Sequence, residues 1–564
     1  MTQDVLSDTA SYDTFLYDTT LRDGAQRQGI SFSLNDKLRV TQLLAEFGID
    51  YIEGGWPGSN PKDAEYFRQV RGLNLGRSRM AAFGSTRRVD RRADTDPQLA
   101  ALLAAETPVV TLVGKSSPLH VEYILRTTRE DNLKVIYDSV KLMKAEGREV
   151  VLDAEHFFDG YAEDSQYALA CLQAATEAGA DWLVLCDTNG GSLPEQIATT
   201  VAAVRQAVTT PIGVHCHNDS ELAVANSLAA VRAGARQVQG TINGIGERCG
   251  NANLVSVLAN LALKTAHRCA AAEQLAALTA LSRAVADIAN LAPDAFAPFV
   301  GVNAFAHKGG LHVAAIEKLQ ASYEHIDPLR VGNGRQVVVS ELAGRGNVRL
   351  RARELGLELA GEEARVADQI KQAEARGLQL ETADGSFELI VRRHLPGYQP
   401  PFAVRDLHVH TAQRDGVSEP SLATAKVTVA GQQELTAAEA SGPVAAIDAA
   451  LRKALKPFYP ELEGVRLTDY KVRILDPEAA TGATTRVWIE AAYGEQRWCT
   501  VGCSDNIIAA SAEALRDSLE LFVLRLQCPR FAAGSIADIP TETETDVKKG
   551  NHHGRSERPC ENLA

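Results

Sequence analysis

Two histidines two positions apart are the clearest chemical signal in the chain. His215 and His217 lie in residues 211–223, PIGVHCHNDSELA. In an extended strand residues i and i+2 project to the same side, so both imidazoles face one way and Cys216 faces the other. Two imidazoles on one face can clamp a metal ion. For this pair alone, two solvent-facing histidines on an edge strand fit equally well.

A carboxylate could complete such a metal site. Two neutral imidazoles and one carboxylate leave open positions on a divalent ion, which then acts as a Lewis acid on a carbonyl oxygen. Asp23, beside Arg22 in DTTLRDGAQ, is the best candidate. The planar fork of Arg22 suits a carboxylate or a developing enolate. A local surface ion pair between Arg22 and Asp23 is the alternative.

A repeated strand and helix must position these residues. From Phe15 to Gly244 a short apolar strand followed by a helical stretch recurs at a period of roughly 30 residues. Eight such units predict a closed (β/α)8 TIM barrel, with an open doubly wound sheet as the alternative. The predicted strands are residues 15–21, 50–55, 79–84, 109–114, 149–156, 182–188, 212–218 and 237–244.

Polar side chains gather where the predicted strands end. Barrel enzymes carry their active site at the carboxyl ends of the strands, so this pattern favours the closed barrel. The residues concerned are Asp18, Arg22, Asp23, Gln26, Asp153, Glu155, His156, Asp187, Thr188, Asn189, His215, His217, Glu247, Arg248 and Asn251.

The rest of the chain predicts further domains. A helical connecting subdomain that contributes to the active site follows the barrel, and then comes an α+β regulatory or dimerisation domain of strands and a helix, twice over. A polar tail without a periodic apolar face is expected to be disordered. The predicted boundaries are 1–290 for the barrel, 291–387 for the connecting subdomain, 388–532 for the α+β domain and 533–564 for the tail.

Composition excludes several classes of protein. The chain has 564 residues and a net charge of −14, which argues against nucleic-acid binding. The polar N-terminus has no signal-peptide core, and no apolar stretch reaches membrane-spanning length, so we expect a cytoplasmic protein without a membrane partner. The nine cysteines show no paired framework, which predicts reduced thiols.

Four motifs carry a resemblance to a known family. DTTLRDGAQ, HCHND, NGIGERCGNANL and AFAHKGGLHV resemble the acyl-CoA-condensing aldolases of the isopropylmalate, homocitrate and citramalate synthase family. The resemblance covers nearly the whole chain. It implies a metal-dependent Claisen-type condensation of acetyl-CoA, the co-substrate, with a 2-oxo acid, followed by hydrolysis of the thioester. GISFS, YIEGGWPGSNPKD, DAEHFFDGY, CDTNGG and YEHIDPLRVGN are most similar to the citramalate branch, whose acceptor is pyruvate and whose product enters isoleucine synthesis.

The resemblance also implies roles for individual residues. Arg22 would polarise the keto oxygen. The expected metal site is Asp23, His215 and His217, with Asn251 close to the ion. The expected binding residues for the 2-oxo acid are Glu155, Thr188 and, as a weaker candidate, His307. The expected acid and base positions are Glu247, His312 and Tyr323. The ion itself is open among zinc, manganese and magnesium.

The family forms dimers, and His312 would reach the active site of the neighbouring subunit of a homodimer. The C-terminal module resembles the family's regulatory domain, for which isoleucine or leucine is the expected effector, with residues 504–511 near the site. Ala440 stands where the usual GxGPV turn has glycine, so this match is looser. The alternatives are a 2-isopropylmalate or homocitrate synthase, an acyl-CoA lyase running the chemistry backwards, and a non-catalytic amino-acid sensor.

Overall fold

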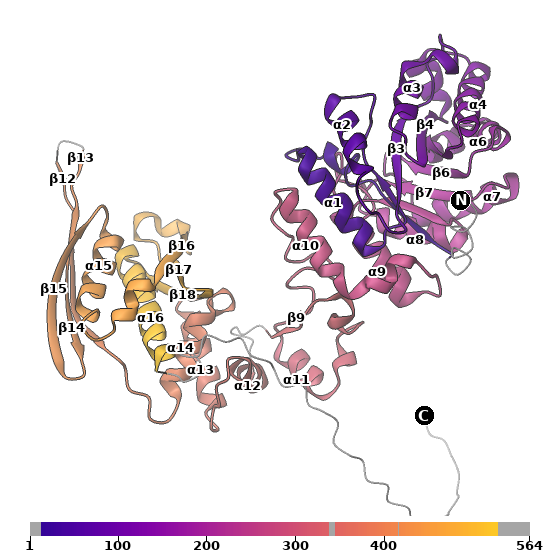
Figure 1. Cartoon of the computed structure of the whole chain (residues 1–564). Coiled ribbons are helices and arrows are strands. Elements are labelled where there is room, and N and C mark those ends of the chain that lie inside the picture. The colour runs from indigo at the N-terminus through magenta and orange to yellow at the C-terminus, as the bar shows by residue number, and fades with distance from the viewer. Residues whose placement is uncertain (1–12, 338–343, 415–416, 528–564) are drawn as a thin grey trace, which may run out of the picture. The chain divides into compact units, whose positions relative to one another are not determined.

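The computed structural model describes residues 13–337, 344–414 and 417–527. These residues form two compact units, Met1–Val338 and Val339–Ala564 (Figure 1). The predicted connecting subdomain, 291–387, spans the boundary between the units. The predicted tail, 533–564, lies outside the described residues.

The first unit contains a closed barrel of parallel strands that are hydrogen-bonded in chain order. The last strand pairs with the first, Phe15 opposite Gln237 and Asp18 opposite Gly240. The predicted (β/α)8 barrel is therefore confirmed, and the doubly wound sheet is excluded. The strands are β1 (Phe15–Asp18), β2 (Tyr51–Glu53), β3 (Arg79–Ser85), β4 (Val109–Lys115), β5 (Glu149–Glu155), β6 (Trp182–Asp187), β7 (Ile212–Cys216) and β8 (Gln237–Gly240).

Helices surround the barrel, and several begin at a capping side chain that accepts a hydrogen bond from a free backbone N–H group. Ser33, Asn60, Asp96, Thr128 and Asp164 cap α1, α2, α3, α4 and α6 in this way. The helices are α1 (Leu34–Phe47), α2 (Pro61–Val70), α3 (Pro97–Ala104), α4 (Arg129–Ala145), α5 (Phe157–Glu163), α6 (Ser165–Ala178), α7 (Pro194–Ala207), α8 (Ala223–Ala233) and α9 (Leu254–Lys264).

Alternation along the strands produces two cores. One set of side chains packs outward against the helices. The other fills the barrel interior, where the buried cluster includes Tyr17, Tyr51, Val109, Val151 and Trp182. Because strand side chains alternate with a period of two, the residue two positions further along each strand also faces inward. Several of these are polar, so the interior changes from apolar to polar toward the carboxyl ends of the strands.

The barrel is followed by α10 (Leu278–Ile288) and a segment with little regular structure. This segment contains β9 (Ala306–His307), α11 (Gly310–Lys318) and β10 (Gln336–Val337), and β9 pairs with β10. Figure 1 shows α11 well apart from the barrel strands.

The second unit contains the predicted arrangement of strands then a helix, twice over. Its first half is β11 (Ala403–His410), β14 (Ser421–Val429), β15 (Gln432–Ala440) and α15 (Pro443–Leu455), with a short hairpin of β12 (Gln413–Arg414) and β13 (Val417–Ser418). Its second half is β16 (Arg466–Ile474), β17 (Thr485–Tyr493), β18 (Gln496–Ser504) and α16 (Ile507–Leu526). Three helices precede them, α12 (Arg345–Glu354), α13 (Glu363–Ala375) and α14 (Asp384–His394).

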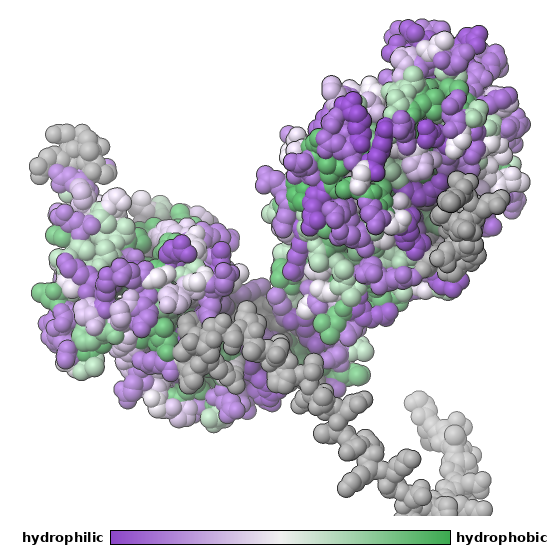
Figure 2. Space-filling model, in the orientation of Figure 1, coloured by the Kyte–Doolittle hydropathy of each residue, from purple (hydrophilic) through white to green (hydrophobic). Residues whose placement is uncertain are grey.

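These three helices share a core cluster with Val501 of β18, so they belong to the second unit. Within the described residues, no helix combines the length and hydropathy needed to cross a bilayer. On the face drawn in Figure 2, hydrophilic residues predominate in both units, with smaller hydrophobic areas between them.

Candidate active site

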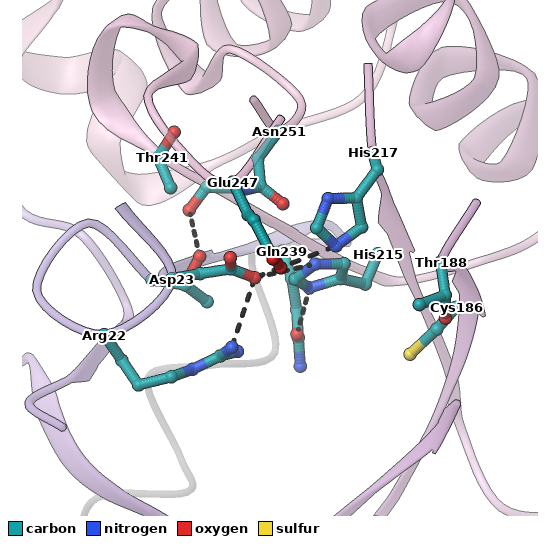
Figure 3. A network of polar contacts seen from close by, with 12 residues as sticks. Arg22, Asp23, Cys186, Thr188, His215, His217, Gln239, Thr241, Glu247 and Asn251 are labelled. Atoms are coloured by element: carbon teal, nitrogen blue, oxygen red, sulfur yellow. Dashed lines mark hydrogen bonds and ion pairs between the residues drawn. The ribbon is translucent and has the colours of Figure 1, made fainter. Parts of the chain in front are cut away.

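Asp23, His215 and His217 meet at the carboxyl end of the barrel. One ligand atom from each lies within 4.8 Å of the others, and all three residues are buried. Nε2 of His215 is 3.3 Å and Nε2 of His217 is 3.9 Å from Oδ2 of Asp23. Figure 3 shows the three side chains directed at one point. Asp23 follows β1 and the histidines end β7, so closure of the barrel brings them together.

The cluster fits a divalent cation. Oδ1 of Asp23, Nδ1 of His217 and Oδ1 of Asn251 are buried and have no hydrogen-bond partner among the described residues. Buried polar atoms without a partner are rare, because each costs about 1–3 kcal/mol. A bound ion would remove this cost for the oxygens that it reaches. Two imidazoles with one carboxylate form a donor set suited to several divalent metals.

The charges of the cluster also suit a cation. Burial alone would raise the pKa of Asp23, but Arg22 and the two imidazoles hold it well below its ordinary value. Burial would lower the pKa of His215, yet the neighbouring Asp23 raises it above the ordinary value. Burial and the nearby His215 lower the pKa of His217 to about 4. Asp23 is therefore ionised and His217 neutral near pH 7, the forms in which these residues bind metals.

A buried chain of hydrogen bonds orients His215. Its Nδ1 lies 2.8 Å from Oε1 of Gln239, and Nε2 of Gln239 donates to Oδ1 of Asp153 at 2.9 Å. Since the amide nitrogen of Gln239 is committed to Asp153, its oxygen accepts from His215. Nδ1 therefore carries a proton, which leaves Nε2, on the side of Asp23, as the ring atom that could bind an ion. Burial and the nearby Glu53 raise the pKa of Asp153 to about 7.

Arg22 is held on three sides. Its Nε donates to Oε1 of Glu53 at 2.6 Å, and Nη1 lies 3.2 Å from Oδ2 of Asp23. The guanidinium carbon is 4.0 Å from the ring centroid of Phe83. Glu53 is itself fixed by the hydroxyl of Tyr17, which donates to Oε2 at 2.6 Å. Arg22 and Asp23 do form an ion pair, but both side chains are largely buried in the barrel mouth, so the alternative of a surface ion pair is wrong.

The loop that follows β8 brings Asn251 to the cluster. Gly250 has φ +93°, and a Cβ there would lie 2.0 Å from the carbonyl oxygen of Gly244, so only glycine fits. The backbone of Asn251 forms an isolated bridge with that of His217. Glu247 lies on the same loop with an exposed side chain, and Figure 3 draws it directed toward the cluster.

The two expected binding residues for the 2-oxo acid lie at neighbouring strand ends. The hydroxyl oxygen of Thr188 accepts a hydrogen bond from the backbone N–H of His156 at 2.8 Å. Its own hydrogen therefore remains available to another acceptor. Glu155 pairs with Lys115, and both side chains are about one quarter exposed. His156 adopts a left-handed conformation with φ +57°, a strained geometry common at functional sites.

His307, His312 and Tyr323 belong to the segment after α10, and their contacts lie within that segment. Nε2 of His307 is 3.1 Å from Oε1 of Glu324. The carboxylate of Glu324 also forms a bidentate ion pair with Arg335. The rings of His312 and Tyr323 stack with centroids 4.1 Å apart, and both side chains are exposed. In the part of the chain that is described, no hydrogen bond or ion pair connects these three residues to Asp23, His215 or His217.

Sequence reasoning missed three supporting residues, Glu53, Gln239 and Lys115. Glu53 and Lys115 end their strands, so the strand-end rule applied to the other strands would also have selected them. Gln239 is a polar residue inside a short strand. Its inward direction follows only from the strand register, in which His215 lies opposite it.

Three family models match consecutive parts of the chain. Residues 14–285 match the HMGL-like family, residues 299–377 the homocitrate synthase post-HMGL domain-like family, and residues 381–523 the LeuA allosteric (dimerisation) domain. The fold and the site therefore define an HMGL-like barrel enzyme with a LeuA-type dimerisation domain.

Curated relatives narrow this class. An (R)-citramalate synthase from Synechocystis is 49% identical over 520 residues, which cover 90% of this chain and 95% of the relative. Another from Aquifex aeolicus is 49% identical over 501 residues, covering 88% and 95%. A probable 2-isopropylmalate synthase from Methanopyrus kandleri is 32% identical over 491 residues, covering 87% and 94%. The chain belongs to the (R)-citramalate synthase family.

Proposed function

We propose that the barrel site joins acetyl-CoA to pyruvate and hydrolyses the thioester, giving citramalate and CoA for isoleucine synthesis. One observation carries the proposal: Arg22 lies 3.2 Å from Asp23, in a cluster with two imidazoles, in a chain 49% identical to (R)-citramalate synthases. The reaction is an acyl transfer of the Claisen type, in which the acyl group becomes an alkyl group.

Arg22 would polarise the keto oxygen of pyruvate. Glu53, Asp23 and the ring of Phe83 fix the plane of its guanidinium. A planar fork held in this way keeps its remaining N–H groups aimed without further loss of side-chain entropy. Donors already directed at an oxygen on which negative charge develops stabilise the transition state more than mobile donors do.

A divalent ion would be held by Asp23, His215 and His217, with Asn251 alongside. When bound, it supplies Lewis acidity toward the keto oxygen. Zinc, manganese and magnesium are all compatible with the family, and the donor set favours zinc or manganese over magnesium, which prefers oxygen ligands. Removing the metal with a chelator and restoring each ion in turn identifies the one that returns activity. Full activity in the chelated, metal-free protein would contradict the assignment.

Thr188 and Glu155 would bind the acceptor acid. Because the hydroxyl oxygen of Thr188 already accepts from the backbone of His156, its hydrogen is free for the carboxylate of pyruvate. Lys115 holds Glu155 at the end of the neighbouring strand. His307 is committed to Glu324, so we assign it to support of its own segment ahead of substrate binding.

The acid and base would come from both subunits of a homodimer. Glu247 extends from the loop after β8, whereas His312 lies on α11, which Figure 1 shows apart from the barrel strands, and its ring stacks on that of Tyr323. A second copy would bring this pair to the site. Removal of a methyl proton and activation of water for thioester hydrolysis need such groups near the reacting atoms.

Mixed dimers test this assignment. Asp23→Ala and His312→Ala are each expected to be inactive alone. If His312 acts across the dimer, dissociating and mixing the two variants restores about a quarter of wild-type activity, because half of the dimers are hybrids and each has one intact site. A mixture that stays inactive, although mass spectrometry detects hybrid dimers, would assign His312 to its own barrel, and activity of His312→Ala alone would exclude it from catalysis.

The acceptor is tested by following CoA release with acetyl-CoA and either pyruvate, 2-oxoisovalerate or 2-oxoglutarate. We expect a clear preference for pyruvate. A preference for 2-oxoisovalerate or 2-oxoglutarate would instead indicate an isopropylmalate or homocitrate synthase, and cleavage of citramalyl-CoA without synthesis would indicate a lyase. The Asp23→Ala variant should be inactive, whereas Asp287→Ala, at an exposed site on α10, should retain full activity. No turnover with any acid, together with amino-acid binding, would favour the sensor.

The LeuA-type domain would bind a feedback effector, with isoleucine ahead of leucine. A cavity of about 770 Å³ lies between β11 and the start of α16, and Ser504, Asn506, Ile508 and Ala509 line it. These residues belong to the predicted segment 504–511. Calorimetry with isoleucine and leucine, and with alanine as the control ligand, tests the site. Ala509→Trp should obstruct part of the cavity and reduce the heat, whereas unchanged heat would place the effector elsewhere.

A further inference from the structure

The loop between β3 and α3 is fixed from inside by one arginine. Nη1 of Arg87 donates to the backbone carbonyls of Arg88 at 3.0 Å, Val89 at 3.3 Å and Arg91 at 2.9 Å. Nη2 of Arg87 donates to Oδ2 of Asp138, on α4, at 2.8 Å. The Arg87 side chain is only 9% exposed. Three loop carbonyls therefore turn toward one buried cation, which holds the loop in a single shape.

The same loop exposes two free cations. Arg88 and Arg91 are exposed, and within the described residues neither side chain has a hydrogen bond or an ion pair. Arg92 is also exposed, but Asp94 neutralises it through a contact of 2.6 Å. Asp90 lies between the two free arginines with an exposed carboxylate. The loop thus presents two free guanidinium groups against one free carboxylate.

This charge lies on the active-site side of the barrel. The loop leaves the carboxyl end of β3, the end that carries the active site in barrel enzymes. Phe83, on β3, packs 4.0 Å from the guanidinium of Arg22. Arg88 is five residues further along, so its Cα lies within about 18 Å of that of Phe83 even if the chain is fully extended. Arg88 therefore lies near the residue that packs against Arg22, and Arg91 lies three residues further along the same loop.

We infer that Arg88 and Arg91 bind the phosphates of the nucleotide end of acetyl-CoA. The inference rests on the proposed function, which requires this co-substrate. The thioester of acetyl-CoA lies at one end of a long pantetheine arm, and the diphosphate and 3′-phosphate lie at the other. When the thioester is at the reacting centre, the phosphates lie far from Asp23, His215 and His217, so the cations that bind them must stand on the outer loops of the barrel mouth. Guanidinium forks bind phosphate oxygens in pairs. In a chain with a net charge of −14, local cations must overcome a general repulsion of polyanions.

The test is the double variant Arg88→Gln with Arg91→Gln, which keeps the loop backbone and the Arg87 contacts. We expect the KM for acetyl-CoA to rise roughly 5- to 30-fold, since each exposed charge pair contributes modestly. The KM for acetyl-pantetheine, which lacks the nucleotide, and the KM for pyruvate should stay unchanged. The matched control is Arg39→Gln with Arg232→Gln, at exposed positions on α1 and α8, which should leave every constant unchanged.

Acetyl-dephospho-CoA, which lacks the 3′-phosphate but keeps the diphosphate, then distinguishes the two groups that the arginines could bind. A variant effect that disappears with this substrate assigns the arginines to the 3′-phosphate, and one that persists assigns them to the diphosphate. An unchanged KM for acetyl-CoA in the double variant would overturn the inference while leaving the proposed function intact. An equal rise with acetyl-pantetheine would also overturn it, because the loop would then act through structure alone. If the wild type releases no CoA from any acid, the proposed function fails, and calorimetry with CoA on both proteins still tests the arginines.

Discussion

Gln239 offers a sharp test of how the barrel interior supports the side-chain cluster of Asp23, His215 and His217. Its amide bonds to Nδ1 of His215 at 2.8 Å and to Asp153 at 2.9 Å, and all three residues are buried. Gln239→Leu keeps a similar volume but removes both bonds. Each partner left without a hydrogen bond costs about 1–3 kcal/mol, so the barrel should lose roughly 2–6 kcal/mol of stability. The imidazole also loses the group that fixes its proton, so affinity for the ion should fall about 10- to 100-fold.

The same strand provides a matched control. Gln237 lies two residues earlier and is fully buried, but neither of its amide atoms has a partner among the described residues. Gln237→Leu removes a buried amide that makes no bond, so it should be neutral or stabilising. The assay is titration of metal-depleted protein with zinc or manganese, combined with urea unfolding of each variant. Ion affinity that is equal in the two variants would refute the positioning role of Gln239.

Three further predictions concern the same barrel. Arg22→Lys removes the planar fork held by Glu53, so kcat should fall about 100-fold or more while circular dichroism stays unchanged; a fall below fivefold would contradict the role. Burial raises the pKa of Asp50 to about 6. The folded chain therefore keeps a proton on Asp50 that the unfolded chain releases above about pH 4. The free energy of unfolding should decrease as the pH rises from about 4 to 6. Asp50→Asn should remove about 3 kcal/mol of this pH dependence, and urea midpoints that run parallel to those of the wild type across that range would refute it. Gly250→Ala should destabilise the barrel by roughly 2–5 kcal/mol, because φ is +93° and the new Cβ would meet the carbonyl oxygen of Gly244; an unchanged thermal midpoint would show that the loop can relax.

The barrel could be predicted because its strands repeat at a regular spacing and end in polar residues. The meeting of Asp23 with His215 and His217 followed from closure of the barrel, and the structure places them together. In the second unit β15 could not be predicted. Its sequence, QQELTAAEA, is rich in Ala, Glu and Gln, which disfavour strands, and pairing with β14 supplies what local preference lacks.

The supporting residues were harder to predict than the central ones. A carboxylate beside an arginine, or two histidines on one strand, indicates a functional site by residue type alone. Gln239 and Glu53 matter only through partners on other strands, and those partners are defined by the register of a closed sheet. Our proposal that His312 and Tyr323 act on the barrel of a second copy of the chain comes from the family resemblance and not from these residues alone. Their catalytic role remains a prediction.

The position of the cluster has a consequence for folding. Asp23 follows the first strand and the histidines end the seventh, with β8 pairing between them. During synthesis the carboxylate leaves the ribosome long before the imidazoles, and their meeting requires the contact of highest sequence separation in the barrel. Tight ion binding therefore cannot precede closure of the ring. The signal of a metal-sensitive probe during refolding would therefore report the rate of barrel closure. Ions added at the start of refolding should neither speed the formation of the barrel nor stabilise a partly formed sheet.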